Sequence, residues 1–227
     1  MRNFLFATLT IAAGGLIIGG MPSATAALLT VASYDMPNGD GGAHGGGANY
    51  WDGNYNGAGN PHQDGLSGGY LSGGTGALAD GVIAANPFFD YFGLYPTAPY
   101  VGWLASPTIK FQFASAVTIG EIKLYVDNCH CAGVTSPSDI IVNGTDYAVP
   151  NWQYASPPLT IDITGLNITA KSVDVELVDP TYWVFMSEAQ FFSSAVPELG
   201  SWAMMIIGFG GVAFRLRRGA GATAATI

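Results

Sequence analysis

The chain has 227 residues, 10% of them charged, and this length suits one domain with a sizeable core once an export segment is removed. Between residues 27 and 196, fifteen acidic residues are set against three lysines, a net formal charge of −12. This balance argues against a nucleic-acid partner, since such binding needs Lys and Arg to neutralise phosphates, and it is compatible with divalent cations, neutral sugars and basic partners.

Residues 1–26, MRNFLFATLTIAAGGLIIGGMPSATA, have the layout of a secretory signal peptide. Arg2 precedes an apolar stretch at 4–18, and the letters ATA at 24–26 supply the small residues of a cleavage site. A first transmembrane helix is the alternative, but the central glycines and the cleavage site argue against it. We therefore expect an exported chain that begins near Ala27.

Residues 27–76 are expected to carry the first strands of the domain within long loops. Fifteen of the forty residues from 37 to 76 are glycine. A purely flexible linker would lack the aromatic residues found there, which are Tyr50, Trp51, Tyr55 and Tyr70. The sequence ANYWDGNY is the best candidate for a strand in this segment.

Six segments after residue 98 contain the apolar runs expected of β-strands, most of them alternating apolar and polar residues. They are TIKFQF (108–113), EIKLYVD (121–127), DIIVNGTDYAV (139–149), LTIDIT (159–164), SVDVELV (172–178) and YWVFMSEAQFF (182–192). Asn143-Gly144 lies between two apolar runs, which is a strong hairpin signal. No long amphipathic helix is evident before residue 197. The pattern predicts an all-β fold, a jelly-roll β-sandwich of about eight antiparallel strands with its core in residues 77–194.

The order of several short sequences in this body resembles the discoidin, or F5/8 type C, family. These are GALADGV, YVGWL, TIKFQF, VTIGEIKLYVDN, GVTSPSDIIVNG and WVFMSEAQFF, and the resemblance covers roughly residues 68–192. It implies a galactose-binding-like sandwich of the kind used as a carbohydrate-binding module.

The resemblance also implies a structural calcium ion. Members of the family often hold it between an Asp-Gly loop and a glutamate of the last strand, which correspond here to Asp80 and Glu188. Calcium takes six to eight oxygens, so carbonyls near Leu78 and Val82 would have to contribute. The alternatives are a turn-forming Asp80 and a Glu188 that faces solvent.

DNCHCAG, residues 127–133, holds the only two cysteines, Cys129 and Cys131, on either side of His130. Residues so close together cannot surround a zinc ion, and alternate side chains of an extended chain point apart, which disfavours a catalytic Cys-His pair. In an oxidising compartment, a small disulfide that holds a loop is the favoured interpretation. Zinc binding, free thiols and an intermolecular link are the alternatives.

The family resemblance places sugar binding at the loops of one end of the sandwich, where aromatic rings and a few polar groups are needed. The candidate ligand-binding residues are Trp51, Tyr100, Trp103, Asn128, His130, Trp152 and Tyr182. Trp103, like Trp183, suits the core equally well. The body contains no arginine and no familiar catalytic motif.

Residues 197–218, PELGSWAMMIIGFGGVAFRLRR, contain fifteen uncharged residues at 200–214. As a helix they would span about 22 Å, against about 30 Å for the hydrocarbon core, so hydropathy alone gives a short transmembrane helix. The segment resembles the PEP-CTERM sorting signal of Gram-negative bacteria. The residues that carry this resemblance include Pro197, Glu198, Trp202, Gly208, Arg215, Arg217 and Arg218.

The resemblance implies an exosortase-type processing enzyme as a partner and the inner membrane as a second one, through residues 200–214. Two departures bear on cleavage. Leu199 stands where the second proline of the motif is expected, and a tail at 219–227 follows the arginines.

Together these features predict an exported, non-catalytic binding or structural protein. It would be held in the cell envelope, displayed at the surface or associated with an exopolysaccharide matrix, with a glycan as its candidate ligand. The alternatives are an extracellular hydrolase that acts on polysaccharide and a purely structural surface protein without a small ligand.

Overall fold

The computed structural model describes residues 26–150, 152–156 and 158–194. Nearly all of the predicted signal peptide, and the whole sorting segment with the tail at 219–227, lie outside the described residues. Within the described ranges, no helix is long and apolar enough to cross a bilayer. The strands are β1 (Leu28–Leu29), β2 (Ser33–Pro37), β3 (Tyr70–Gly74), β4 (Val101–Trp103), β5 (Thr108–Val126), β6 (Val134–Thr135), β7 (Asp139–Val142), β8 (Thr145–Ala148), β9 (Leu159–Val178) and β10 (Trp183–Ser193), with short 3-10 helices η1 (Gly42–His44) and η2 (Phe88–Leu94).

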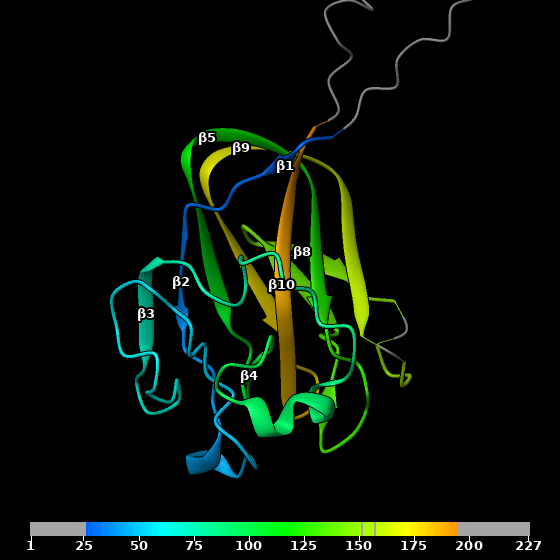
Figure 1. Ribbon diagram of the computed structural model, residues 1–227. Helices are drawn as coiled ribbons and strands as arrows, with labels where there is room; N and C mark the ends of the chain where they lie inside the picture. Colours follow the sequence, from blue (N-terminus) through cyan, green and yellow to red (C-terminus); the bar gives the residue numbers. More distant parts are fainter. Residues whose placement is uncertain (1–25, 151, 157, 195–227) are drawn as a thin grey trace, which may run out of the picture. The chain divides into compact units, whose positions relative to one another are not determined.

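The predicted all-β fold is confirmed, and its pairing is antiparallel except where β6 meets β10. The main path through the sheet runs β1-β10-β5-β9-β7-β8, and β2 adds to the first half of β5. The strands predicted at 108–113 and 121–127 form the single long strand β5, and those predicted at 159–164 and 172–178 form β9. Both β5 and β9 arch over one end of the body, so that the sheet folds back on itself into a jelly-roll-like sandwich (Figure 1).

The bend has a local cause in irregular pairing between the two long strands. Ile119 pairs with Ile168, whereas Glu121 pairs with Thr164, so β9 has extra residues opposite Gly120. Gly165 lies in this bulge with φ 74°, a left-handed conformation that glycine adopts without steric cost. Bulges of this kind bend a strand and let it change layers.

The sandwich core is built from the alternating side chains of the long strands. Ile109, Phe111 and Phe113 of β5 are buried, as are Val173 and Val175 of the paired half of β9. The intervening residues of β5, such as Lys110, are more exposed. The period-two pattern therefore identified the buried face of these strands, as expected when one face of a sheet is solvated.

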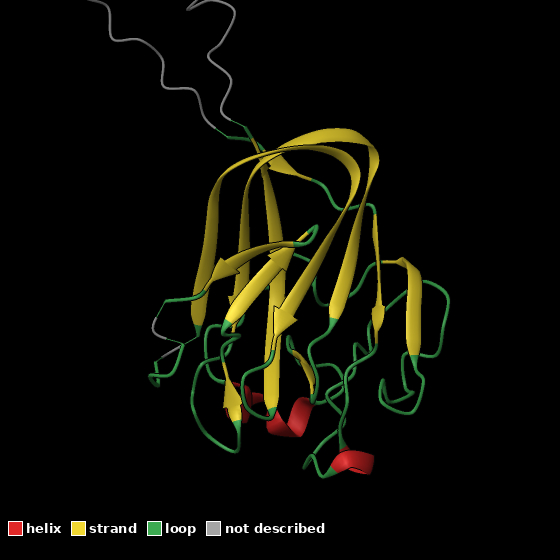
Figure 2. Cartoon of the chain, turned by 180° about the vertical axis from the view of Figure 1, so that it is seen from behind, coloured by secondary structure: helices red, strands yellow, loops and turns green. Residues whose placement is uncertain are grey.

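The arch and the loops mark opposite ends of the body (Figure 2). Near the arch, the amide of Ser193 donates to the carbonyl oxygen of Ala27 at 2.8 Å, so the two ends of the described chain lie together. At the opposite end lie η1, η2 and the loops that connect the strands (Figure 1). This loop end holds the candidate site.

The strand proposed for ANYWDGNY is wrong, because residues 48–55 form loops and turns. Side chains rather than a strand ladder bind the backbone here. Asn38 accepts the amide of Asp52 at 2.9 Å, and Asp52 in turn accepts the Tyr34 hydroxyl and the amide of Ala77. Buried Asn and Asp residues thus hold this glycine-rich segment in place.

Candidate functional site

A second hydrophobic cluster, here called the end cluster, lies at the loop end and is separate from the sandwich core. Its buried members are Tyr50, Ala84, Phe88, Tyr100, Val134, Trp183 and Phe185. Tyr50 is at its centre, with its ring edge-on to those of Tyr95 at 4.7 Å, Phe185 at 4.8 Å and Trp183 at 5.1 Å between centroids. Edge-to-face contacts at these distances are favourable for aromatic rings.

A small pocket of about 70 Å³, here called the end hollow, opens over this cluster. It is lined by Gly45–Gly47, Tyr50, Phe88, Ala132, Val134, Trp183 and Phe185. The glycines are needed because aromatic rings pack directly on the loop. A Cβ on Gly46 would lie 2.9 Å from the Tyr50 ring, and one on Gly47 would lie 2.4 Å from the Phe92 ring.

Exposed aromatic rings stand beside the end hollow. The side chain of Tyr182 is 53% exposed, lies against Gly133 and contacts Trp183 edge-on. From η2, the rings of Phe89 and Phe92 stack at 6.0 Å and an interplanar angle of 15°, and both are exposed. The site therefore offers flat apolar faces next to the backbone amide and carbonyl groups of a glycine loop.

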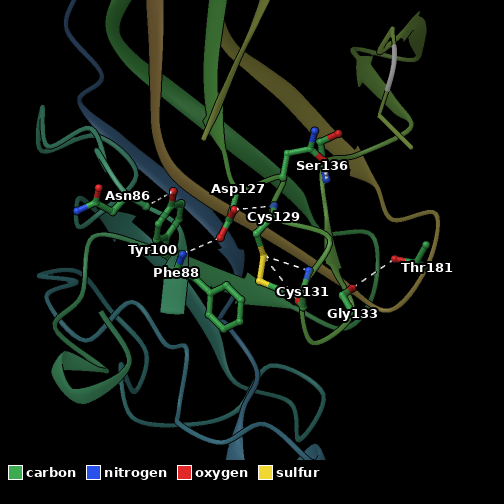
Figure 3. Close-up of a disulfide and its surroundings, with 10 residues drawn as sticks. Asn86, Phe88, Tyr100, Asp127, Cys129, Cys131, Gly133, Ser136 and Thr181 are labelled. Carbon is green, nitrogen blue, oxygen red and sulfur yellow. Dashed lines mark hydrogen bonds between the residues drawn. A yellow bond between two sulfur atoms is a disulfide. The ribbon is translucent and has the colours of Figure 1, made fainter. Parts of the chain in front are cut away.

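Asp127 ties two walls of the hollow together (Figure 3). Its carboxylate accepts the amide of Phe88 at 2.7 Å and the amide of Cys129 at 3.0 Å. Burial of the carboxylate raises its pKa, and the amides act in the opposite direction by stabilising the charged form. One buried side chain thus fixes both the start of η2 and the loop that follows β5.

That loop contains a Cys129–Cys131 disulfide with an S–S distance of 2.07 Å. Among the described residues, no group of three or more His, Cys, Asp and Glu side chains is arranged to hold a metal ion. The Nε2 atom of His130, between the cysteines, lies 2.7 Å from the carbonyl oxygen of Trp152. The disulfide loop is thereby joined to residues 152–156.

Three of the predicted ligand-binding residues are buried, and their polar atoms bind within the protein. The Tyr100 hydroxyl donates to the Asn86 carbonyl, and the Trp103 indole donates to the Pro37 carbonyl. The Asn128 side chain donates to Tyr154 and Ser156 and accepts the amide of Ser136. We therefore assign Tyr100, Trp103 and Asn128 to packing and loop support rather than to a ligand surface.

The other predicted ligand-binding residues fall in different places. Tyr182 stands beside the end hollow, whereas Trp152 packs against the sandwich core. Trp51 lies in the glycine-rich segment, with its ring edge-on to His62 at 5.9 Å. The candidate set is thus not gathered into one site, because identity as an aromatic residue does not reveal which way a loop turns.

Sequence reasoning missed the residues that build the hollow. The glycine-rich composition predicts only loops at Gly45–Gly47, and the predicted ligand-binding residues do not include Phe88 and Phe92. The signal available was the run FFDYF at 88–92, an aromatic cluster in a segment without strand alternation. Its position opposite the glycines depends on contacts distant in sequence.

The two residues expected to hold calcium lie next to each other, Asp80 in the loop that follows β3 and Glu188 on β10. Glu188 is buried, and its carboxylate accepts the amide of Gly81 at 3.2 Å, while Asp80 accepts the amide of Val82 at 2.8 Å. Burial raises the pKa of Glu188 to about 7, and the nearby charge of Asp80 adds to the rise. In the part of the chain that the structure describes, no ion pair involves Glu188.

A buried carboxylate without a cationic partner next to a second carboxylate fits calcium, which prefers oxygen ligands. Asp80 and Glu188 would supply two of them, and the ion would neutralise their charge. The carbonyl of Leu78, a further predicted ligand, accepts the amide of Ala189 at 2.9 Å, and a carbonyl oxygen has two lone pairs.

Several solved structures are similar to the chain at low identity. A chitosan-binding module from Paenibacillus sp. IK-5 is 18% identical over 41% of this chain and 76% of that one, with a TM-score of 0.29. The lectin domain of lectinolysin, complexed with Lewis B antigen, is 15% identical over 52% and 83%, with a TM-score of 0.37. The family 32 module of C. perfringens NanJ, in complex with galactose, is 12% identical over 52% and 82%, with a TM-score of 0.32.

No curated protein matches the chain. A family model does match, and it covers most of the chain from residue 30 to residue 193. It describes the DS-like domain of discoidin domain-containing receptor 1/2, with residues of β2 through β10 inside the matched range. The chain therefore belongs to the family of discoidin DS-like domains.

Proposed function

We propose that the chain is an exported, non-catalytic module that binds saccharides without negative charge at the end hollow. The observation that carries this proposal is the arrangement of exposed Tyr182, Phe89 and Phe92 around a glycine loop. The apolar C–H face of a sugar ring can pack on such aromatic rings, while its hydroxyls need nearby donors and acceptors. The carbonyl groups of Gly45–Gly47 are the nearby acceptors, whereas the amide of Gly46 already donates to the carbonyl of Gly41.

The charge of the loop end supports the choice of ligand class. No Lys or Arg occurs in residues 38–107 or 127–158, or at 179–183, the segments that build this end. Asp90 follows Phe89 on η2 and is exposed, and Asp179 lies three residues before Tyr182. Uronates and sulfated sugars would meet only like charges and find no basic side chain to bind. Neutral or amine-bearing sugars avoid that cost.

Export is supported by the Cys129–Cys131 disulfide, because such bonds persist in oxidising compartments. The signal-peptide layout of residues 1–26 and the PEP-CTERM-like sequence at 197–218 are consistent with the same route. The proposal includes insertion of residues 200–214 in the inner membrane during transit and recognition by an exosortase-type enzyme. The final location is then the cell envelope, the surface or the exopolysaccharide matrix of a Gram-negative bacterium.

Processing can be tested by mass spectrometry of the protein recovered from its host. A mature chain that begins near residue 27 and ends near residue 197 is the expected result. A chain that keeps residues 200–214 in the envelope fraction would instead make the segment a lasting membrane helix.

Saccharide binding can be tested with the full chain on immobilised agarose, a neutral galactan, and on polygalacturonate as the anionic counterpart. We expect retention on agarose and none on polygalacturonate. Tyr182→Ala should weaken retention about fivefold, because one aromatic contact contributes about 1 kcal/mol. Tyr70→Ala is the matched control, since Tyr70 is equally exposed but lies on β3.

The remaining outcomes separate the alternatives. Release of shorter oligosaccharides would favour a hydrolase, and failure to bind agarose, cellulose and chitosan alike would favour a purely structural surface protein. Loss of binding in both tyrosine variants would place the site elsewhere on the body.

A further inference from the structure

We propose that the Cys129–Cys131 disulfide is a latch that thiol reductants open, and that its state regulates binding at the end hollow. This inference rests on the proposed function of the hollow, and it names how that site is regulated. Three features carry it, which are the local reach of the disulfide, the backbone conformation that it encloses, and the contacts of its loop with the hollow.

The disulfide constrains only a short piece of chain. Cys129 and Cys131 are separated by one residue, so the bond closes a very small loop. The stabilisation that a disulfide gives by restricting the unfolded chain grows with loop length, and it is small here. Both cysteines are only partly buried, so a reductant can approach them. The consequence of this bond is therefore local rather than a general support of the fold.

The backbone around the disulfide is one that it helps to hold. His130 and Ala132 have φ angles of 51° and 50°, in the left-handed region that residues with a Cβ rarely adopt, and Gly133 follows at 85°. Among the described residues, few hydrogen bonds hold Cys131. Its amide lies 3.3 Å from the Cys129 sulfur, and its carbonyl accepts the amide of Val134 at 2.9 Å. Once the bond is open, His130 and Ala132 are free to return to ordinary conformations.

The residues that follow the disulfide are the wall of the end hollow. Ala132 and Val134 line it, and Gly133 lies between them. The carbonyl of Gly133 accepts the amide of Trp183 at 3.1 Å and the Thr181 hydroxyl at 3.4 Å. A Cβ on Gly133 would lie 3.2 Å from the Tyr182 ring, so that ring rests on this glycine. A shift of the loop would remove the support of Tyr182 as well as the wall.

The other side of the loop reaches η2 through Asp127, whose carboxylate binds the amides of both Cys129 and Phe88 (Figure 3). Both cysteines also pack against the end cluster. Figure 3 shows the disulfide between this carboxylate and Gly133. Opening the bond therefore loosens two walls of the hollow at once.

The reaction is an ordinary thiol–disulfide exchange. The sulfur–sulfur bond of the protein breaks and accepts two electrons and two protons, which leaves the thiols of Cys129 and Cys131. The reductant, a dithiol such as dithiothreitol, is oxidised to its own cyclic disulfide. Removal of the reductant and addition of oxidised glutathione should reverse the step.

The test uses the full chain and two measurements. The first is hydrogen exchange of peptides that contain Gly45–Gly47 and residues 181–185, with and without dithiothreitol. The second is retention on immobilised agarose. On reduction we expect faster exchange in both peptides and retention weakened about tenfold, within the range typical of coupling between sites. Peptides from the long strands β5 and β9 should not change.

The double variant C129S/C131S should behave like the reduced protein and should not respond to dithiothreitol. If this variant fails to fold, reversible reduction of the native chain gives the same information. Unchanged exchange at both peptides after complete reduction would overturn the proposal. Agarose binding that is the same before and after reduction would overturn it as well. Failure of the oxidised protein to bind agarose would instead contradict the proposed function, and the exchange measurement alone would then test the latch.

Discussion

The sandwich core and the end cluster are two hydrophobic regions of one body that are held together differently. The core comes from regular strands, and its residues, such as Ile109 and Val175, are placed by the pleat alone. The end cluster is mostly aromatic, and only Val134, Trp183 and Phe185 of its buried members stand on paired strands. Its other buried members come from loops and from η2. The comparison teaches that alternating apolar residues and the strand ladder suffice to hold the regular part of the fold. The irregular part also needs individual polar side chains that bind its backbone.

Those polar residues are buried and specific. Asn38, Asp40, Asp52 and Asp127 are all at most 2% exposed, and each accepts backbone amides from segments distant in sequence. Burial raises the pKa of each of the three carboxyls. The loop end therefore depends on groups that are costly to bury and valuable once bound.

The largest effect is expected in the sandwich core. Phe111→Ala removes a buried ring that packs on Phe191 at 4.9 Å, and it should lower the free energy of unfolding by about 4 kcal/mol. Urea unfolding followed by circular dichroism measures this. Phe92→Ala, a partly exposed ring at the loop end, is the control and should cost less than about 1 kcal/mol. Equal losses in the two variants would contradict the distinction between the regions.

A smaller loss is expected when a buried acid of the loop end is removed. Asp40 accepts the amides of Leu66 and Leu104 at 2.8 and 2.9 Å, and Asp40→Ala leaves both without this partner. We expect a loss of about 3 kcal/mol in the free energy of unfolding. Asp146→Ala, at an exposed position on β8, should change it by no more than about 0.5 kcal/mol. A neutral result for Asp40 would mean that water replaces the carboxylate.

The pH dependence of stability should report Glu188. Its pKa is about 7 in the folded protein and about 4.5 in the unfolded chain, so the folded state keeps a proton that the unfolded state releases. The contribution of Glu188 to stability in EDTA is therefore greatest below pH 4.5 and is lost as the pH rises from 4.5 through 7, by about 3 kcal/mol. Glu188→Gln should remove this slope, measured as the difference between variant and native unfolding curves at pH 5 and pH 8.

Calcium should act on the same carboxylate in the opposite sense. Binding requires the ionised form, so the apparent affinity for calcium should rise from pH 5 to pH 8. Added calcium should raise the melting temperature at pH 8, and EDTA should reverse the change. Asp80→Asn should weaken this stabilisation, and a native protein indifferent to both calcium and EDTA would exclude the ion.

The smallest effect on stability, with a clear effect on binding, is expected at the glycine loop. Gly47→Ala places a methyl group where the Phe92 ring now lies, and that ring can move because it is partly exposed. Retention on agarose should fall about fivefold, the scale of one lost apolar contact, while the melting temperature changes little. Gly93→Ala is the matched control, since a Cβ there meets no atom within 4 Å.

The sequence predicts the sandwich core better than it predicts the end cluster. The alternation of apolar and polar residues identified the buried faces of β5 and β9, because successive side chains of a strand point to opposite faces of the sheet. It did not reveal that each of these strands is continuous, since a bulge at Gly165 is not visible as a pattern. The disulfide between the two cysteines could be predicted from their spacing together with the predicted export. The end hollow could not, because it depends on loops that approach one another from distant parts of the chain.

One strand also gives the body a mechanical axis. β10 begins at Trp183, in the floor of the hollow, and ends at Ser193, beside Ala27 at the arch end. Hydrogen bonds of an antiparallel ladder run across the strands. A pull between a saccharide in the hollow and the end of β10 would therefore load its bonds to β5 together, in shear. A pull that separates Ala27 from Ser193 would instead open the short β1–β10 pairing bond by bond. The body should resist force applied at the hollow better than force that parts its two ends.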